Sequence, residues 1–171
     1  LLSEAVAVLH IRSVYDIDGV DQVPGGIAAV RDPANAAYAT RPARFLRVEK
    51  AVSQPDDDTR DIDNTAFGPN RALGMRDILG YAPIEPDGSV KVKVPANVAF
   101  NISVLDARGR RLNGAFGSRH TNWLQVIPGE QLECNGCHNP ATNPPRAHGR
   151  AGLSASVNAG ATTNGSAFPN T

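Results

Sequence analysis

The chain has 171 residues, and its 17 basic and 17 acidic side chains give a formal net charge of zero. This length favours one domain, or one domain followed by a tail. The balanced charge gives no composition-level argument for a nucleic acid or an anionic membrane as partner, and no apolar run approaches the roughly 18 residues of a membrane-spanning helix.

Two strands are predicted in the N-terminal half. Residues 6–16 alternate between apolar and polar positions and are rich in β-branched side chains, which is typical of a strand. Residues 44–52 show a similar pattern. The intervening residues 17–42 are rich in glycine, proline and alanine, which predicts a long loop with a short helical turn near residues 33–38.

The middle of the chain predicts a single helical turn followed by a β-meander. Residues 75–81 are expected to form the turn. Residues 88–94 alternate strictly, with valines on one face and lysines on the other, and residues 99–107 alternate less cleanly. The short link at residues 95–97 favours direct pairing of these two strands.

The predicted elements end in a hairpin and a tail. Residues 120–126 resemble a strand, a turn follows at 128–130, and residues 131–134 run back. From residue 139 onward the sequence is rich in Pro, Gly, Asn and Ala and has no periodicity. We therefore predict an all-β fold, a two-sheet β-sandwich over residues 1–138, and an irregular tail over 139–171 that packs on a cofactor or a partner.

The sequence Cys134-Asn135-Gly136-Cys137-His138 fits the pattern C-x-x-C-H of covalent haem attachment. Two thiols three positions apart can add to the two vinyl groups of one haem, and the adjacent histidine then lies under the iron. His138 is therefore the expected proximal ligand. Two cysteines and four histidines placed at random give this arrangement on the order of once in four thousand times, so the pattern is specific.

Two other interpretations of the cysteine pair stay open. Both thiols, His138 and a further histidine would make a Cys₂His₂ set for structural zinc, although zinc sites space their ligand pairs differently. A disulfide or a redox dithiol is the other interpretation, but the sequence shows no thioredoxin-like strand–helix context. Haem attachment is the interpretation that we favour.

The predicted hairpin brings Trp123 close to Cys134. With the turn at residues 128–130, the two residues lie nearly opposite each other on neighbouring strands. Trp123 is the only tryptophan, and we expect it to cover a face or an edge of the porphyrin. An ordinary core tryptophan of a sandwich fits the same pattern equally well.

Several side chains are candidates for the second axial ligand of the iron. His148 follows His138 by ten residues, a span long enough to reach round a haem edge. His120 lies on the predicted hairpin, and Met75 is the only methionine. An open iron site and a ligand from another chain are the remaining alternatives. His10, on the first predicted strand, is expected to be a packing or surface residue.

Clustered carboxylates raise the alternative of a calcium site. The clusters are Asp56, Asp57, Asp58, Asp61 and Asp63 and, more weakly, Asp16, Asp18 and Asp21. The first cluster lacks the glycine and the terminal glutamate of an EF-hand loop. A solvated run of charge is therefore the interpretation that we favour, with Ca²⁺ as the alternative.

Several short motifs occur in an order that is found in one known family. They are residues 81–88, 94–97, 105–106, 128–130 and the C-x-x-C-H motif at 134–138. This succession resembles the haem-bearing middle domain of the hydrazine synthase alpha subunit and related bacterial c-type cytochrome domains. The resemblance implies a β-rich domain inside a larger exported protein, with its haem attached through Cys134 and Cys137 at the end of a hairpin.

The sequence departs from that family in one respect. In hydrazine synthase, a tyrosine shortly after the motif binds the iron and leaves the motif histidine free for zinc. The last tyrosine of this chain is Tyr81, which precedes the motif. The departure weighs against hydrazine chemistry and favours iron ligation by His138.

We therefore expect an electron-transfer module rather than an independent enzyme. It would carry one covalent haem c in a larger exported redox assembly, with other haem-bearing chains or domains and a redox protein as partners. One alternative is a catalytic haem that acts on a small nitrogen or oxygen compound, with Arg119 or His120 as proton donor. The other is a structural zinc domain.

The expected location follows from the attachment chemistry. Haem attachment of this type needs an oxidising compartment, which predicts a periplasmic or extracellular protein. The chain begins with Leu1 rather than methionine, and we interpret it as a mature product or a piece of a larger protein.

Overall fold

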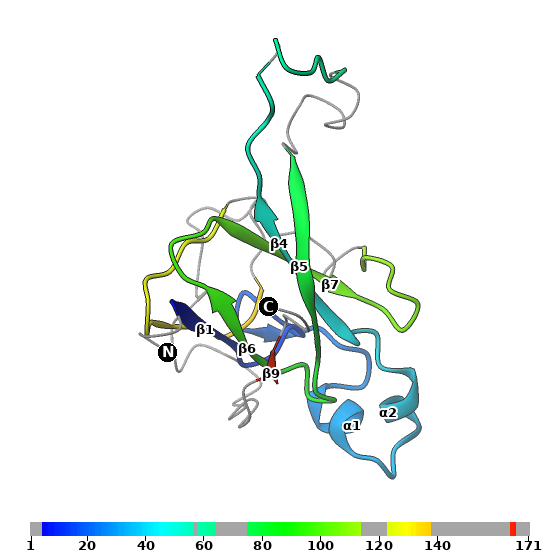
Figure 1. Ribbon diagram of the computed structural model, residues 1–171. Coiled ribbons are helices and arrows are strands. Elements are labelled where there is room, and N and C mark those ends of the chain that lie inside the picture. Colours follow the sequence, from blue (N-terminus) through cyan, green and yellow to red (C-terminus); the bar gives the residue numbers. More distant parts are fainter. Residues whose placement is uncertain (1–4, 57, 64–74, 114–122, 138–164, 167–171) are drawn as a thin grey trace.

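The computed structural model describes residues 5–56, 58–63, 75–113, 123–137 and 165–166. These residues form strands in several sheets and two short helices, so the all-β prediction is confirmed (Figure 1). The strands are β1 (Val6–Ile11), β2 (Asp16–Ile17), β3 (Val20–Asp21), β4 (Phe45–Ala51), β5 (Arg76–Pro83), β6 (Val90–Pro95), β7 (Phe100–Leu105), β8 (Gln131–Cys134) and β9 (Gly165–Ser166). The helices are α1 (Ile27–Arg31) and α2 (Ala36–Thr40). None of the described helices is long and apolar enough to cross a membrane.

The first sheet has the strand order β8-β1-β6-β9. Strand β1 pairs antiparallel with β6 and parallel with β8, and β9 pairs parallel with β6. The alternation predicted for β6 is confirmed, because its three valines are buried and the two lysines between them are partly exposed. The parallel pairing of β1 with β8 places the cysteine motif beside the residues that follow β1.

The second sheet has the order β5-β4-β7, with antiparallel pairing throughout. Strand β4 confirms the strand predicted over residues 44–52. The helical turn predicted at residues 75–81 is wrong, because this segment forms most of β5. Pairing with β4 outweighs the weak local preference of so short a segment.

Strands β2 and β3 form a small third sheet. Buried side chains from the two larger sheets form one hydrophobic cluster. It includes Leu9 of β1, Val92 of β6, Leu46 of β4 and Phe100 of β7. Burying a side chain of this size contributes about 1.5–3 kcal/mol to folding. The shared cluster joins the two sheets into one unit, while a regular two-sheet sandwich stays a prediction.

The predicted β-meander is wrong. Strands β6 and β7 follow each other in the chain, but β6 pairs with β1 and β7 pairs with β4. In the link between them, Asn97 has a φ of 59° and its N–H donates to the carbonyl of Val126 at 2.8 Å. The link therefore carries the chain from one sheet to the other instead of closing a hairpin.

The hairpin predicted before the cysteine motif is also wrong. Strand β8 pairs with β1, and the described part of the other predicted arm makes only an isolated bridge, from Leu124 to Phe100. The N–H of Gly129 donates to the carbonyl of Val6, and the N–H of Val8 donates to the carbonyl of Glu130. These bonds align the chain beside β1, so it does not turn back on residues 123–126.

Residues 17–42, predicted as a long loop, contain β3 and both short helices. Asp21 accepts a hydrogen bond from the N–H of Ile27 at 2.8 Å, where α1 begins. Asn35 caps α2 by accepting from the N–H of Ala37 at 3.0 Å. The turn expected near residues 33–38 is therefore found as α2, slightly later in the chain.

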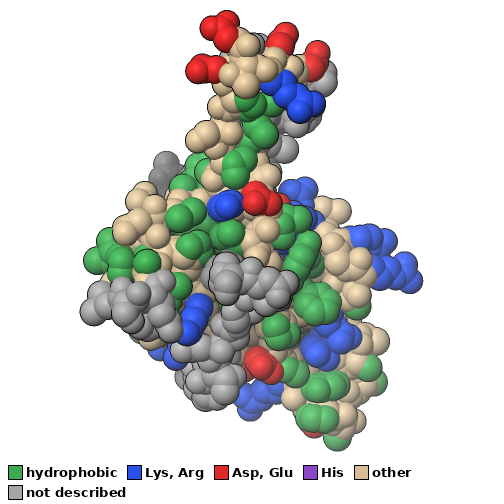
Figure 2. Space-filling model, in the orientation of Figure 1, with side chains coloured by type: hydrophobic (Ala, Val, Ile, Leu, Met, Phe, Trp, Pro, Cys, Tyr) green, Lys and Arg blue, Asp and Glu red, His purple; other side chains and the backbone are tan. Residues whose placement is uncertain are grey.

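A projecting arm follows β4 and carries acidic side chains at its far end (Figures 1 and 2). The described carboxylates of this arm are all exposed: Asp56, Asp58, Asp61 and Asp63. Exposure to water fits a solvated run of charge. Asp57 lies outside the described residues.

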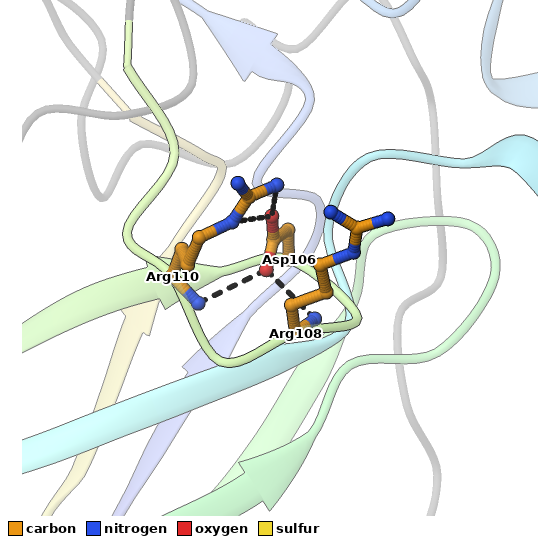
Figure 3. Close-up of polar contacts among 3 residues, drawn as sticks. All are labelled: Asp106, Arg108 and Arg110. Carbon is orange, nitrogen blue, oxygen red and sulfur yellow. Dashed lines mark hydrogen bonds and ion pairs between the residues drawn. The ribbon is translucent and has the colours of Figure 1, made fainter.

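The turn after β7 is organised by one carboxylate (Figure 3). One oxygen of Asp106 accepts from the backbone N–H groups of Arg108 and Arg110 at 2.8 and 2.9 Å. The other accepts from the Arg110 guanidinium at 2.9 and 3.1 Å. These donors lower the pKa of Asp106, with the backbone N–H of Arg110 contributing most.

Only part of the predicted tail is described. Residues 165–166 form β9, which pairs with Val92 and Lys93 of β6. The rest of residues 139–171 lies outside the described part of the chain, so packing of the tail on a cofactor or partner stays a prediction.

Candidate functional site

The two cysteines lie along one segment of the N-terminal region. Cys134 ends β8 and stands opposite Ile11, the last residue of β1. Cys137 forms an isolated parallel bridge with Ile17. The C-x-x-C turn therefore runs alongside residues 11–18, which we call the backing segment.

Four backbone hydrogen bonds fasten the C-x-x-C turn to the backing segment. The carbonyl of Cys134 accepts from the N–H of Arg12 at 2.9 Å, and the carbonyl of Asn135 accepts from the N–H of Ser13 at 2.9 Å. The N–H of Cys137 donates to the carbonyl of Asp16 at 2.8 Å, and its own carbonyl accepts from the N–H at position 18 at 3.1 Å. Both cysteines are thus held by their backbones, whatever their side chains bind.

Glycine is required at the third position of the motif. A Cβ on Gly136 would lie 2.3 Å from the carbonyl oxygen of Asp16 and 2.6 Å from that of Ser13. Protein atoms thus fill the side of the turn that faces the backing segment. A bulky group attached to the cysteines must therefore approach from another side.

Ser13 links the backing segment to the turn that precedes β6. Its hydroxyl donates to the carbonyl of Asp87 at 2.7 Å and accepts from the N–H of Tyr15 at 3.2 Å. The N–H of Val14 donates to the carbonyl of Gly88 at 2.8 Å. The backing segment is therefore held on both sides, between the cysteine turn and the turn before β6.

Both thiols are free and partly buried, and both pack against the hydrophobic cluster. Burial raises the pKa of Cys134, and Glu133 adds to the effect. Burial also raises the pKa of Cys137 to about 12, with smaller contributions from Cys134 and Asp16. Both cysteines are therefore free in this structure, at positions i and i+3, and burial disfavours their thiolate forms.

Charged residues flank the motif on β1 and β8. Glu133 forms an ion pair with Arg12, with 2.7 Å between a carboxylate oxygen and Nε. His10 stands opposite Glu133 on β8 and Lys91 on β6. It is buried, as expected for a packing residue, and its Nε2 has no hydrogen-bond partner among the described residues. Burial lowers the pKa of His10, although Glu133 opposes the shift.

Trp123 is not opposite Cys134 as predicted. It precedes Leu124, which bridges to β7 of the second sheet, and its ring lies 5.3 Å from the guanidinium carbon of Arg76. Arg76 in turn pairs with the buried carboxylate of Glu49 at 3.5 Å. Met75 immediately precedes Arg76, the first residue of β5, so Met75 and Trp123 both lie next to the second sheet. A role of Trp123 beside the porphyrin stays a prediction.

Three predicted histidines, His120, His138 and His148, lie outside the described residues. Among the described residues, no group of three or more His, Cys, Asp or Glu side chains gathers in a way that would hold a metal ion. The carboxylate of Asp21 receives hydrogen bonds from the N–H groups of Val23 and Ile27, which gives it a structural role. The calcium alternative therefore has no supporting geometry in this part of the chain.

The described residues fit a covalently bound haem. Two thioether bonds to one haem need two free thiols at this spacing, which Cys134 and Cys137 provide on a turn held by backbone hydrogen bonds. Sequence reasoning found the cysteines but missed the backing segment. No pattern within residues 6–17 shows that they pair in parallel with residues more than a hundred positions later.

The chain matches one family model and is similar in structure to a solved protein. Residues 41–139 match the family described as the hydrazine synthase alpha subunit middle domain. In structure, the chain is similar to Kuenenia stuttgartiensis hydrazine synthase, with 22% sequence identity and a TM-score of 0.56. The alignment covers 86% of this chain and 18% of that chain, so this chain spans less than a fifth of its length. At this identity the likeness shows the fold alone. No curated protein matches.

Proposed function

The chain belongs to the hydrazine synthase alpha subunit middle-domain family, and from that premise we propose that it is a c-type cytochrome module of a larger exported redox assembly. One haem would be bound through Cys134 and Cys137, with His138 as the proximal ligand. The module would transfer electrons to and from other haem-bearing chains or domains.

One observation carries this proposal. The chain offers two free thiols at i and i+3 on a turn held by four backbone hydrogen bonds, directly before a histidine. Each thiol would add across one vinyl group of the haem, so that a C–S and a C–H bond would form and nothing would leave. A haem attached in this way would be held to the chain by two covalent bonds.

The chain's own residues then define the haem environment. The backbone-bonded turn would hold the attached porphyrin, and His138 would supply the nitrogen ligand. Bound haem would supply one-electron redox chemistry. His148, His120 and Met75 remain the candidates for the second axial position.

Extraction by acid–acetone tests the attachment. We expect the haem to stay with the exported chain, and Cys134→Ala and Cys137→Ala each to retain one thioether bond. The matched double variant should lose all haem to the solvent. Haem that extracts fully from the unmutated chain would refute covalent attachment, and a colourless protein with one zinc per chain would support the structural zinc alternative.

The family name of an enzyme subunit favours one second candidate, a catalytic haem with an open iron site. Carbon monoxide separates the two functions, because it binds ferrous iron only where a coordination position is open or easily vacated. We expect the spectrum of the reduced protein to change little when carbon monoxide is added. Rapid and complete binding would instead support catalysis on a small nitrogen or oxygen compound.

A further inference from the structure

Asp16 has a buried carboxylate with only one oxygen hydrogen-bonded among the described residues. The residue is 1% exposed, and one oxygen accepts from the N–H of Gly19 at 2.7 Å. Its Oδ2 is buried without a hydrogen-bond partner among the described residues. The ion pairs found among those residues all use other carboxylates. Among the described residues, no cationic side chain therefore pairs with this carboxylate.

This carboxylate lies beside the cysteine turn. The backbone carbonyl of Asp16 accepts from the N–H of Cys137 at 2.8 Å. A Cβ on Gly136 would lie 2.8 Å from the Cβ of Asp16, so the side chain leaves the backbone next to the middle of the motif. Asp16 is thus in contact with the turn that carries both thiols.

An uncompensated charge in a buried position is costly, because water no longer solvates it. The cost falls when a positive charge comes near. A haem attached at Cys134 and Cys137 brings such a charge, since the iron–porphyrin core is more positive by one unit in the ferric than in the ferrous state. A nearby fixed carboxylate favours the ferric state for this reason.

We propose that Asp16 holds a fixed negative charge beside the haem attachment turn and thereby lowers the midpoint potential of the bound haem. The inference rests on the proposed function, because it needs a haem on Cys134 and Cys137. In the step concerned, the iron gains one electron from a one-electron donor, and Asp16 exchanges neither electrons nor protons. Its role is electrostatic, through the iron's redox equilibrium.

A redox titration of the haem-loaded chain, with mediators and dithionite, tests the inference. Asp16→Asn keeps an oxygen that can accept from Gly19 and removes the charge. We expect the equilibrium constant for reduction to rise on the order of tenfold, which for a one-electron couple is about 59 mV. Asp16→Ser removes the same charge while its hydroxyl can accept from Gly19, and should shift the potential in the same direction.

Asp18→Asn is the matched control. It removes one negative charge two positions away, from a side chain that is only partly buried, and its φ of 54° is one that asparagine tolerates. Because solvent screens this charge better, the reduction equilibrium should change by less than about threefold.

Three results would overturn the inference. They are an unchanged or lowered potential in both Asp16 variants, an equal shift in the Asp18 control, and an unmutated chain that carries no covalent haem. Only the last also overturns the proposed function. A haem-loaded chain with an unchanged potential overturns the inference alone.

Discussion

Replacing Gly136 with alanine tests the arrangement of the cysteine turn. The new Cβ would lie 2.3 Å from the carbonyl oxygen of Asp16, whereas Cβ contacts shorter than 3.0 Å are essentially never found. The turn and the backing segment must therefore separate by about 0.7 Å or more. The backbone conformation at Gly136 is not left-handed, so lack of space, and not strain in φ, decides the effect.

The expected magnitude follows from this displacement. Overpacking costs about 1–3 kcal/mol, and weakening the two nearest backbone hydrogen bonds costs about 0.5–1.5 kcal/mol each. Alanine restricts the conformations of the unfolded chain, which by itself raises the free energy of unfolding by somewhat less than about 1 kcal/mol. We therefore expect Gly136→Ala to lower the free energy of unfolding by about 3 kcal/mol.

Urea denaturation of the haem-free chain, followed by circular dichroism, measures this change. Gly109→Ala is the matched control, because a Cβ there meets nothing within 4 Å and only the φ of 72° opposes alanine. The control should lose about 1–2 kcal/mol. A Gly136→Ala variant that is as stable as the unmutated chain, or more stable than the control, would show that the turn does not pack on the backing segment.

Three further predictions concern residues around this core. Burial lowers the pKa of His10, so the folded chain binds fewer protons than the unfolded chain, and stability should fall as the pH drops below about 6.5. In thermal melts, His10→Gln should make the melting temperature depend less on pH in this range. The pKa of Asp106 is lowered, so its contribution to the free energy of unfolding is present above about pH 3.8 and is lost as the pH falls through the lowered value. Asp106→Asn should remove this part of the loss of stability in acid. An unchanged dependence of stability on acidic pH would contradict this prediction. Ser13→Ala removes the hydrogen bond to the carbonyl of Asp87 and should destabilise the chain by about 1–2 kcal/mol in urea, whereas no loss would mean that the link between the two turns is dispensable.

The strands that sequence reasoning located best are those with strong alternation. Strand β6 buries Val90, Val92 and Val94 as its pattern indicates, and β4 begins and ends close to the predicted limits. In β6 one face meets the core and carries a valine at every second position, which is enough to identify the strand; in β4 only Leu46 and Val48 form such a buried face. Strand β5 has no such pattern, and its partner β4 determines its conformation.

Pairing partners were the part that sequence reasoning got wrong. It assumed that consecutive strands pair, which both the predicted meander and the predicted hairpin required. Instead β6 and β7 lie in different sheets, and β8 runs parallel to β1. The ladders β1–β6, β1–β8 and β4–β7, and backbone bonds such as those from Asn97 to Val126 and from Gly129 to Val6, join segments that side-chain patterns do not identify as partners.

The sequence alone identifies the cysteine motif of the candidate site but not the segment that supports it. Cys134 and Cys137 stand out because their spacing suits haem attachment, which stays a proposal. Asp16 appeared only as part of a weak acidic cluster, because its burial and its contact with the motif depend on long-range pairing. Trp123 was misplaced for the same reason, since its expected position depended on the hairpin.

The haem content of the exported chain tests the central claim most directly. A pyridine haemochrome spectrum with haem quantified per chain, combined with the intact mass of the denatured protein, measures both stoichiometry and covalent attachment. We expect one haem per chain and a mass increased by one haem, which is lost in the double variant of Cys134 and Cys137. A denatured chain of unmodified mass, or a spectrum without haem after export with the attachment machinery present, would contradict the account.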